Sequence, residues 1–396
     1  MPAPIRVAHV VSTAGRTGVE AHLLALLPSF DRALVAAVLF APGPGPLVDE
    51  MSARGVEVVC GAPTRKLAFD EARRLAERWR GRFDIVHAHG PRAIFWSERA
   101  ARRAGVRAFV VTVHELRWQT MPPGLKREAW IALEGRTLHR AERVITVSNA
   151  TRRDLVARWP RLAERTRVVH ASAPILLAAS APPQSDPGRR DGQPLRLVTI
   201  GRFNWQKGYD LLLPALARLA ARGIDFTLDV VGHGVLEPRL RAEAARLGIA
   251  ERIRWLGRDV DLAPLLAASH AFVTTTRAEM FGIAVLEAMA CGLPVLAPGV
   301  GSLVEVVADG VTGRLLDFDP EGTLAERVAE ELVRWWSDPD LMRRRGTAGA
   351  RRAREVFAPA AFAARVAAVY DELVGGGSHR APRSHGSSPR RLDSRA

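Results

Sequence analysis

The chain has 396 residues, of which 47% are hydrophobic and 25% charged, a composition that suits two globular domains and excludes a chain that is disordered throughout. No apolar run is long enough to span a bilayer and the first residues lack the pattern of a signal peptide, so we expect a cytoplasmic location. The net charge of +15 comes almost wholly from arginine, and this excess alone identifies no partner.

Two further features of the composition bear on chemistry and order. Cys60 and Cys291 are too few for a disulfide framework or a four-cysteine metal site, and their apolar neighbours in the sequence predict that both are buried. Residues 375–396 contain almost no apolar side chain, which predicts a disordered basic tail.

Strands alternate with helices in the first part of the chain, as in a sheet covered by helices. Short β-branched runs predict strands at 5–12, 34–40, 56–60, 84–89, 108–114 and 142–148, and apolar periodicity predicts helices at 19–27, 65–83 and 151–158. Between the first strand and the first helix, Gly15 and Gly18 permit close approach of a diphosphate or an acceptor. An ordinary turn explains these two glycines equally well.

Two of these strands end in histidines, at the edge where a parallel sheet binds its ligands. The strand at 84–89 carries His87 and His89, which we interpret as structural or acceptor-loop residues. His114 ends the strand at 108–114, where an imidazole can donate a hydrogen bond or offset charge that forms during a reaction. For a lone histidine, a structural role is the competing interpretation.

The segment 117–130 mixes the aromatic residues Trp118 and Trp130 with the basic residues Arg117 and Lys126. Such a mixture suits an anionic lipid surface or a phosphate-bearing acceptor. A loop that leads into a helix explains the segment equally well. Further on, residues 176–194 lack periodicity and are rich in Ala, Ser, Pro and Gly, which predicts a linker.

The second half repeats the alternation of strands and helices. Strands are predicted at 195–200, 253–257 and 271–276, and a strand with a glycine turn at 226–234. Helices are predicted at 209–222, 238–247, 283–291, 323–336, 339–356 and 359–373. The loop after the strand at 195–200 contains Arg202 and Lys207. A guanidinium fork and an ammonium charge beside a helix N-terminus suit a diphosphate.

The stretch 270–298, HAFVTTTRAEMFGIAVLEAMACGLPVLAP, predicts a strand, a loop, a helix and a second strand. Glu279 lies in the loop, and Glu287 follows eight residues later on the helix. If the helix reached back to Glu279, the two carboxylates would lie about 80° apart around its axis, so both would face one ligand. The first-turn amides around Phe281 to Ile283 would point at an anion.

The spacing of Glu279 and Glu287, in the context EMFG and LEAMACGLPV, resembles the EX7E signature of retaining GT-B glycosyltransferases of family 4, the glycosyl transferases group 1 class. The resemblance extends over nearly all of residues 5–374, and the Gly-Arg and Lys-Gly elements at 201–208 strengthen it. One departure is His170-Ala171, where the family commonly has Asn-Gly near the hinge between its domains.

The resemblance implies a GT-B fold, with two Rossmann-like parallel-sheet domains that face a central cleft. It divides the chain into an acceptor domain, a linker, a donor domain, a helix that crosses back to the first domain, and the tail. These parts correspond to residues 1–175, 176–194, 195–358, 359–374 and 375–396.

The resemblance also implies transfer of a sugar from a nucleotide diphosphate donor of the UDP or GDP type, with retention at the anomeric carbon. The expected catalytic residues are Glu279, His114, Arg202 and Lys207. The expected donor site combines the two cations at the diphosphate, Glu287 at the ribose, and Glu279 at the sugar with the backbone of Phe281, Gly282 and Ile283.

No cofactor and no metal are expected. The pair Asp259 and Asp261 resembles a metal-binding motif of other transferases, but the start of a helix near Leu262 makes a helix cap the simpler interpretation. The acceptor is expected to be a glycan or a lipid-linked or small molecule in cell-envelope or exopolysaccharide synthesis, with peripheral contact to an anionic membrane and no nucleic acid. A nucleotide-sugar epimerase and a non-catalytic basic binding protein are the alternatives.

Overall fold

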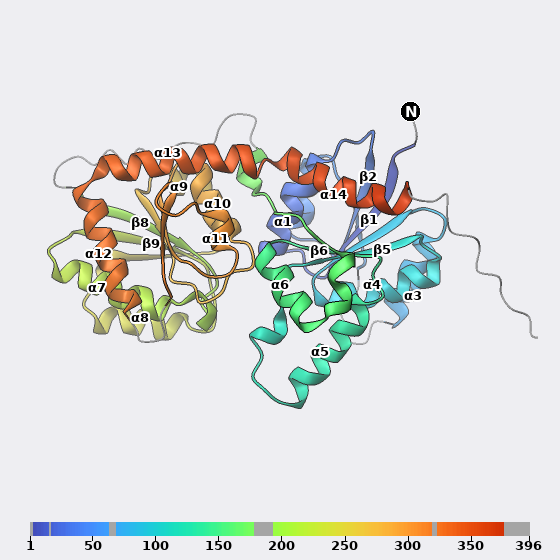
Figure 1. Cartoon of the computed structure of the whole chain (residues 1–396), viewed down its shortest axis with the longest axis horizontal. Helices are drawn as coiled ribbons and strands as arrows, with labels where there is room; N and C mark the ends of the chain where they lie inside the picture. Colours follow the sequence, from blue (N-terminus) through green and yellow to red (C-terminus); the bar gives the residue numbers. More distant parts are fainter. Residues whose placement is uncertain (1–2, 16, 63–68, 178–192, 319–322, 376–396) are drawn as a thin grey trace, which may run out of the picture.

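The structure, a computed structural model, describes residues 3–15, 17–62, 69–177, 193–318 and 323–375. Each half of the chain forms one parallel sheet that is covered by helices (Figure 1). The predicted fold class, two doubly wound Rossmann-like domains, is therefore confirmed. Most of the predicted linker and tail, and the start of the helix predicted at 65–83, lie outside the described residues.

The first sheet has seven parallel strands in the order β3-β2-β1-β4-β5-β6-β7. Its strands are nearly continuous apolar runs because helices cover both faces of a parallel sheet. The strand order reverses between β1 and β4, which is where such a sheet places its ligand crevice. The strands are β1 (Ile5–Val11), β2 (Val35–Ala41), β3 (Glu57–Cys60), β4 (Ile85–His89), β5 (Ala108–Val113), β6 (Arg143–Thr146) and β7 (Thr166–Val168). The helices are α1 (Gly18–Leu26), α2 (Pro46–Ala53), α3 (Phe69–Trp79), α4 (Pro91–Ala104), α5 (Leu125–Leu138) and α6 (Asn149–Arg158).

The second sheet has six parallel strands in the order β10-β9-β8-β11-β12-β13, so its order reverses between β8 and β11. The loops that follow these two strands carry Lys207 and Glu279. The strands are β8 (Leu195–Ile200), β9 (Phe226–Val231), β10 (Ile253–Gly257), β11 (Ala271–Val273), β12 (Val295–Pro298) and β13 (Gly313–Leu316). The helices are α7 (Tyr209–Ala221), α8 (Glu237–Arg246), α9 (Leu262–Ala267), α10 (Ile283–Ala290), α11 (Leu303–Val306), α12 (Leu324–Ser337), α13 (Pro339–Val356) and α14 (Pro359–Val374).

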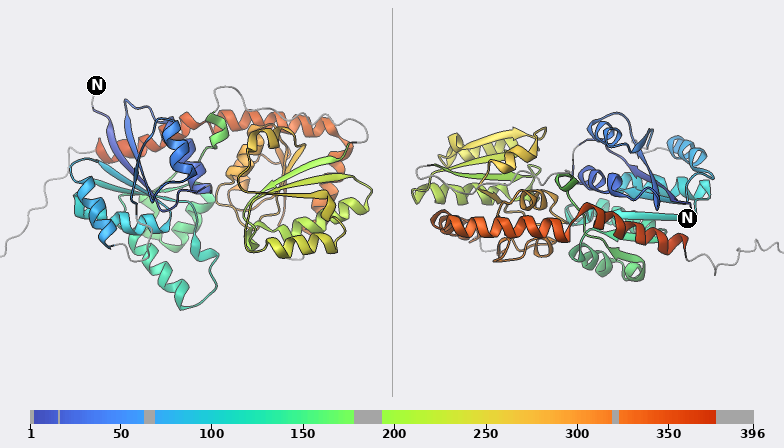
Figure 2. Two further views of the ribbon diagram at one scale, coloured as in Figure 1. Left: turned by 180° about the vertical axis from the view of Figure 1, so that it is seen from behind. Right: turned by 90° about the horizontal axis from the view of Figure 1, so that it is seen from above.

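Helices α13 and α14 run one after the other along one side of the molecule, α13 beside the second domain and α14 beside the first (Figure 2). On α14, Tyr370 is fully buried and hydrogen-bonds to His87 of β4. The carboxylate of Glu372 pairs with Arg143 and Arg167 of the first domain. The last described helix is thus an integral part of the first domain.

Two sequence-based predictions need correction. Cys60 is exposed, because it ends β3 at the edge of the sheet, whereas Cys291 is buried as predicted. The strand predicted at 271–276 ends at Val273, since Thr275 and Thr276 turn to bond the neighbouring loop through their hydroxyl groups.

Candidate active site

Two loops meet at the carboxyl edge of the second sheet, one after β8 and one after β11. Thr276 Oγ1 donates to the carbonyl oxygen of Gln206 at 3.0 Å, and Gln206 Nε2 donates to the carbonyl oxygen of Ala278 at 2.9 Å. The guanidinium of Arg277 adds two bonds to the carboxylate of Asp210 at the start of α7. These bonds hold the two loops as one unit.

Gly208 permits the close approach of these loops. Its φ is +67°, and a Cβ added there would lie 2.1 Å from the carbonyl oxygen of Thr275. Thr275 Oγ1 donates to the carbonyl oxygen of Gly208 at 2.7 Å. Because only glycine fits both the backbone angle and the space, the position of the neighbouring Lys207 depends on it.

The predicted site residues Lys207 and Glu279 form an ion pair. Lys207 Nζ lies 2.6 Å from Glu279 Oε2, and the side chains are 19% and 16% exposed. The backbone carbonyl of Glu279 accepts bonds from Ser302 N and Oγ at 3.0 and 3.2 Å. The carboxylate therefore stands on a fixed loop and beside a cation.

Arg202 extends from the same loop toward the first domain. Its side chain is 60% exposed, and Nη2 lies 4.0 Å from Glu115 Oε2, next to His114. Both predicted cations thus come from the loop after β8. Lys207 contacts the loop after β11, and Arg202 lies at the boundary between the domains.

Glu279 lies in the loop and Glu287 on the helix, as predicted, so the condition under which the two carboxylates would lie about 80° apart around one axis is not met. Gly282 adopts a left-handed conformation with φ of +88° and caps α10, which begins only at Ile283. Glu287 is 9% exposed, and burial raises the pKa of its carboxyl group to about 7. Phe281 is buried and its ring packs against Phe357, so any contact with a ligand at this position involves its backbone.

His114 lies at the end of β5, as predicted, and is partly exposed. Its Nε2 is 3.1 Å from Nδ1 of His89, and its ring meets that of His22 edge-on at 4.5 Å. Burial lowers the pKa of His114 to about 3, so the ring is neutral near pH 7. It can donate or accept a hydrogen bond, but it carries no charge.

Four further histidines gather beneath His114, a cluster that was not predicted from the sequence. His9 on β1 and His22 on α1 join His87, His89 and His114, and all except His114 are fully buried. Two sets of three offer nitrogen atoms within 4.8 Å of one another: His9, His87 and His89, and His22, His89 and His114. The sequence contained a signal for this cluster, since three of the histidines lie on the adjacent strands β1 and β4, where the strand order reverses.

Asp261, one of the two aspartates that resemble a metal-binding motif, has a structural role. Asp261 accepts a bond from the backbone nitrogen of Ala263 and caps α9, which confirms the predicted cap.

Gly15 precedes α1, and Gly18 is its first residue. Apart from atoms of the adjacent residues in the chain, no described atom lies within 4 Å of a Cβ added at either glycine. The conformation of this turn is set instead by Glu20, which is fully buried and accepts bonds from Thr13 Oγ1 and Thr17 N. An assignment of the two glycines to a diphosphate or an acceptor remains a prediction.

Aromatic and basic side chains of the segment 117–130 contact one another. The guanidinium of Arg117 lies 5.0 Å from the centre of the Trp130 ring, and Arg127 Nε donates to the carbonyl oxygen of Trp118. Leu125, at the start of α5, is 92% exposed. Among the described helices, none is both long enough and apolar enough to cross a membrane.

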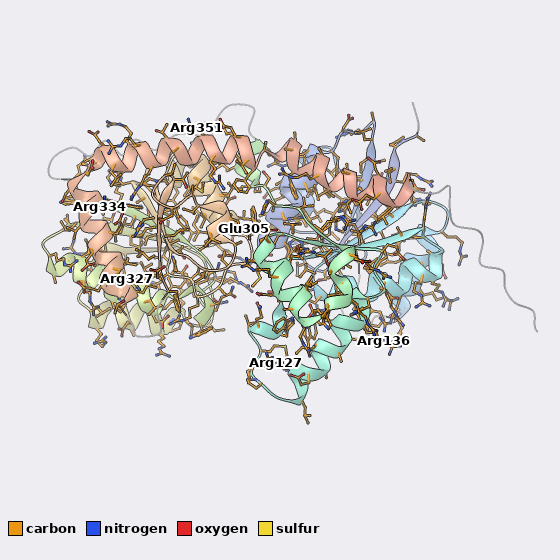
Figure 3. All side chains as sticks on the ribbon, viewed as in Figure 1. Arg127, Arg136, Glu305, Arg327, Arg334 and Arg351 are labelled. Carbon is orange, nitrogen blue, oxygen red and sulfur yellow. The ribbon has the colours of Figure 1, made fainter. Side chains whose placement is uncertain are left out.

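His170, where the sequence departs from the family pattern, takes part in a contact between the two domains. His170 Nε2 lies 2.7 Å from Glu305 Oε2, and the backbone nitrogens of Asn149 and Ala150 donate to the same carboxylate at 2.9 Å. Figure 3 shows Glu305 at the boundary between the two domains. Burial opposes ionisation of Glu305, but these donors outweigh it and lower the pKa of the carboxyl group.

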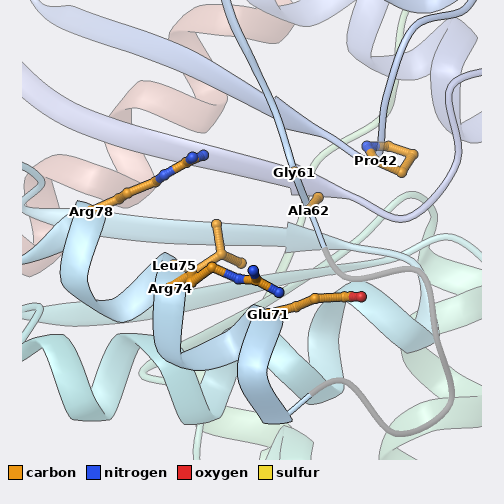
Figure 4. A pocket seen from close by; sticks show the side chains of 7 residues that line it. All are labelled: Pro42, Gly61, Ala62, Glu71, Arg74, Leu75 and Arg78. Carbon is orange, nitrogen blue, oxygen red and sulfur yellow. The ribbon is translucent and has the colours of Figure 1, made fainter.

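A separate pocket of about 280 Å³ lies in the first domain, between the ends of β2 and β3 and helix α3 (Figure 4). Arg74 and Arg78 line it, but Arg74 is paired with Asp70 and Arg78 bonds to the carbonyl oxygen of Cys60. Because no residue of the second domain lines it, this pocket is distinct from the loops that hold Lys207 and Glu279.

The arrangement of two Rossmann-like domains, with a cation and carboxylate pair at the strand reversal of the second, defines the GT-B class of glycosyltransferases. A solved structure of Anabaena HepE in complex with UDP-glucose is similar, with a TM-score of 0.79 at 19% identity, over 93% of this chain and all of that one. The model of the glycosyl transferases group 1 family matches residues 182–352, and that of glycosyltransferase family 4 matches residues 16–172.

Named relatives agree with these matches. The chain is 30% identical to a D-inositol 3-phosphate glycosyltransferase of Thermobispora bispora, over 74% of this chain and 72% of the relative. It is 29% identical to the phosphatidyl-myo-inositol mannosyltransferase of Mycobacterium tuberculosis, over 91% of this chain and 94% of the relative. The chain belongs to glycosyltransferase family 4, group 1.

Proposed function

We propose that this glycosyltransferase moves a sugar from a nucleotide diphosphate donor to an acceptor hydroxyl, with retention of configuration at the anomeric carbon. The observation that carries the proposal is the Lys207 and Glu279 pair, which joins the loops at the strand reversal of the second domain. The UDP-glucose bound to HepE, a protein of the same fold, supports a nucleotide-sugar donor of this kind.

In this proposal the diphosphate lies against Lys207 and Arg202, where an ammonium and a guanidinium stabilise the negative charge that grows on the leaving group. Glu279 accepts hydrogen bonds from the sugar hydroxyls. The amides at the start of α10 face the donor, and Glu287 accepts bonds from the ribose. His114 approaches from the first domain as a neutral group.

The chemical step needs no separate protein base. The bond between the anomeric carbon and the phosphate oxygen breaks, the acceptor oxygen bonds to the same face of that carbon, and the acceptor proton passes to the departing phosphate. We therefore propose transfer that is independent of metal ions and cofactors, since the two cations already provide charge neutralisation.

For the acceptor we propose a glycan or a lipid-linked molecule of the cell envelope. The name of one relative, a phosphatidyl-myo-inositol mannosyltransferase, supports a lipid-linked acceptor, whereas that of another, a D-inositol 3-phosphate glycosyltransferase, agrees with the small-molecule alternative. The exposed Leu125, beside basic residues on α5, is the part of the first domain that we propose contacts an anionic membrane.

The test is the thermal unfolding midpoint with UDP, GDP and ADP in turn, with EDTA present. A nucleotide at ~100 times its Kd stabilises the domain that binds it by about 2.7 kcal/mol. We expect one nucleotide to raise the midpoint, and we expect the Lys207→Ala variant to show a smaller shift and slower transfer. No shift with any nucleotide, and wild-type transfer by Lys207→Ala, would each contradict the proposed donor site.

A further inference from the structure

Three of the buried histidines of the first domain, His9, His87 and His89, belong to a continuous chain of hydrogen bonds that ends at His114. Its consecutive links measure 2.7, 2.6, 3.2, 3.1 and 3.1 Å. In order, the linked atoms are Thr112 Oγ1, His87 Nε2 and Nδ1, Tyr370 Oη, His9 Nε2 and Nδ1, His89 Nε2 and Nδ1, and His114 Nε2. The chain thus connects α14, near the end of the protein, with the partly exposed histidine at the end of β5.

Every ring in this chain is neutral near pH 7. Burial lowers the pKa of His9 and His114 to about 3 and that of His87 and His89 well below the ordinary value. A neutral imidazole has one N–H donor and one bare nitrogen that accepts. Each ring must therefore donate on one side and accept on the other, so all the bonds point in one direction along the chain.

Thr112 determines that direction. In the part of the chain that the structure describes, His87 Nε2 is the only hydrogen-bond partner of Thr112 Oγ1. If His87 donated to the hydroxyl, the hydroxyl proton would be buried without an acceptor, which is unfavourable. The hydroxyl of Thr112 therefore donates to His87, and the proton of His87 lies on Nδ1.

The remaining protons follow from this first bond. His87 Nδ1–H donates to the oxygen of Tyr370, whose hydroxyl donates to His9 Nε2. His9 then donates from Nδ1 to His89, and His89 donates from Nδ1 to His114 Nε2. His114 Nε2 accepts, so its own proton lies on Nδ1, and among the residues that the structure describes this N–H has no hydrogen-bond partner and can donate to a ligand.

We propose that Tyr370 is a positioning residue that fixes the tautomer of His114 through this chain of hydrogen bonds. With the phenol in place, His114 presents a donor N–H to an oxygen of the substrate. In the opposite tautomer it presents a lone pair, which repels the same oxygen. The catalytic consequence rests on the proposed function, whereas the tautomer itself is a property of the protein without substrate.

The test is nuclear magnetic resonance of protein that contains ring-¹⁵N histidine and no substrate. Nitrogen shifts and two-bond couplings identify which ring nitrogen carries the proton, and the signal missing in His114→Asn assigns that residue. In the wild type we expect His114 to be protonated on Nδ1. In Tyr370→Phe, which keeps the ring and removes only the hydroxyl, we expect a mixture of both tautomers at His114.

The matched control is Tyr209→Phe, because Tyr209 is the only other tyrosine and its buried hydroxyl bonds to Gly201 in the other domain. This variant must leave the His114 signals unchanged. A wild-type His114 protonated on Nε2, or an unchanged tautomer in Tyr370→Phe, overturns the proposal. A stoichiometric metal ion bound to His114 in the same samples, measured by elemental analysis, overturns it too, since the metal would replace the hydrogen bond from His89.

A kinetic measurement then separates this inference from the proposed function. If the chain acts on transfer, kcat of Tyr370→Phe falls by about two- to fivefold, in proportion to the population of the wrong tautomer, while the Kd for the nucleotide is unchanged. An unchanged kcat with a mixed tautomer would show that the direction of the His114 N–H does not serve catalysis. Failure to find any transfer in the wild type contradicts the proposed function and leaves the resonance result to decide the tautomer.

Discussion

Lys207 Nζ and Glu279 Oε2 lie 2.6 Å apart, so the cation expected at the diphosphate and the carboxylate expected at the sugar neutralise each other. Both side chains are mostly buried, which strengthens their interaction compared with a pair in water. A diphosphate that binds here must share the ammonium group with Glu279. Under the proposed function, donor binding and the position of the Glu279 carboxylate are thereby coupled.

This coupling predicts opposite effects for the two partners. In Glu279→Gln the ammonium loses its competitor, so we expect the nucleotide that stabilises the protein to bind more tightly, while transfer becomes slower. In Lys207→Ala we expect binding to weaken by roughly tenfold or more, as the loss of a hydrogen bond to a charged group implies. Isothermal titration calorimetry measures both constants, with the exposed Lys126→Ala as the control, and changes of the same sign in the two variants would refute the coupling.

The raised pKa of Glu287 predicts a specific dependence of stability on pH. Between about pH 4.5 and 7 the unfolded chain releases this proton before the folded protein does, so the carboxyl group destabilises the fold increasingly as the pH rises. Glu287→Gln, which stays neutral, should match the wild type at pH 4.5 and exceed its unfolding free energy by about 3 kcal/mol at pH 8. Denaturant titrations at the two pH values measure the difference, and the exposed Glu355→Gln should show no such trend.

Alanine substitutions at two glycines with similar φ angles distinguish the effect of backbone strain from that of a steric clash. Gly208 and Gly223 have φ of +67° and +77°, but only at Gly208 does an added Cβ meet the backbone of Thr275. We expect Gly223→Ala to cost about 1–2 kcal/mol of stability and to keep nucleotide binding. Gly208→Ala should shift the Lys207 loop and weaken nucleotide binding by roughly tenfold or more, like Lys207→Ala. Equal nucleotide affinities in the two glycine variants would contradict the close approach of the loops.

The hydrogen bonds of Glu305 at the domain boundary predict that this contact stabilises the protein. Its carboxylate accepts bonds from Asn149, Ala150 and His170, so we expect Glu305→Ala to lose about 1–3 kcal/mol at pH 7. Because these bonds lower the pKa of Glu305, their contribution is present above the pKa of the unfolded chain and disappears as the pH falls through the folded value. Denaturant titrations at pH 7 and pH 3 should show the difference shrinking, with the exposed Glu251→Ala unchanged at both.

Local patterns predicted the alternation of strands and helices, because parallel strands and amphipathic helices leave a signal within ten or so residues. Helix α4 was not predicted, although Gly90 before Pro91 and Gly105 after Ala104 are the usual signals of a helix start and end. The beginning of α10 at Ile283 was predicted, and the left-handed conformation of Gly282 separates Glu279 from this helix.

Site residues within one motif, such as Glu279, were foreseeable, but their partners were not. The pair Lys207 and Glu279 spans 72 residues, and the contact of His9 with Tyr370 spans 361. Such contacts arise only when the sheets close and α14 returns to the first domain. No local pattern around Tyr370 distinguishes it from an ordinary core residue, since its hydroxyl group acquires its partners from β1 and β4.

The return of α14 also determines the order in which the molecule can be completed during synthesis. The apolar cluster around α1 includes Phe362, Val366 and Tyr370, which leave the ribosome after the entire second domain. Until then, the first domain has an uncovered apolar face and an unfinished set of histidine contacts, although its own sheet is already synthesised. The domain that is synthesised first therefore completes its folding last. A nascent chain that stops before Pro359 exposes an apolar surface to which chaperones bind.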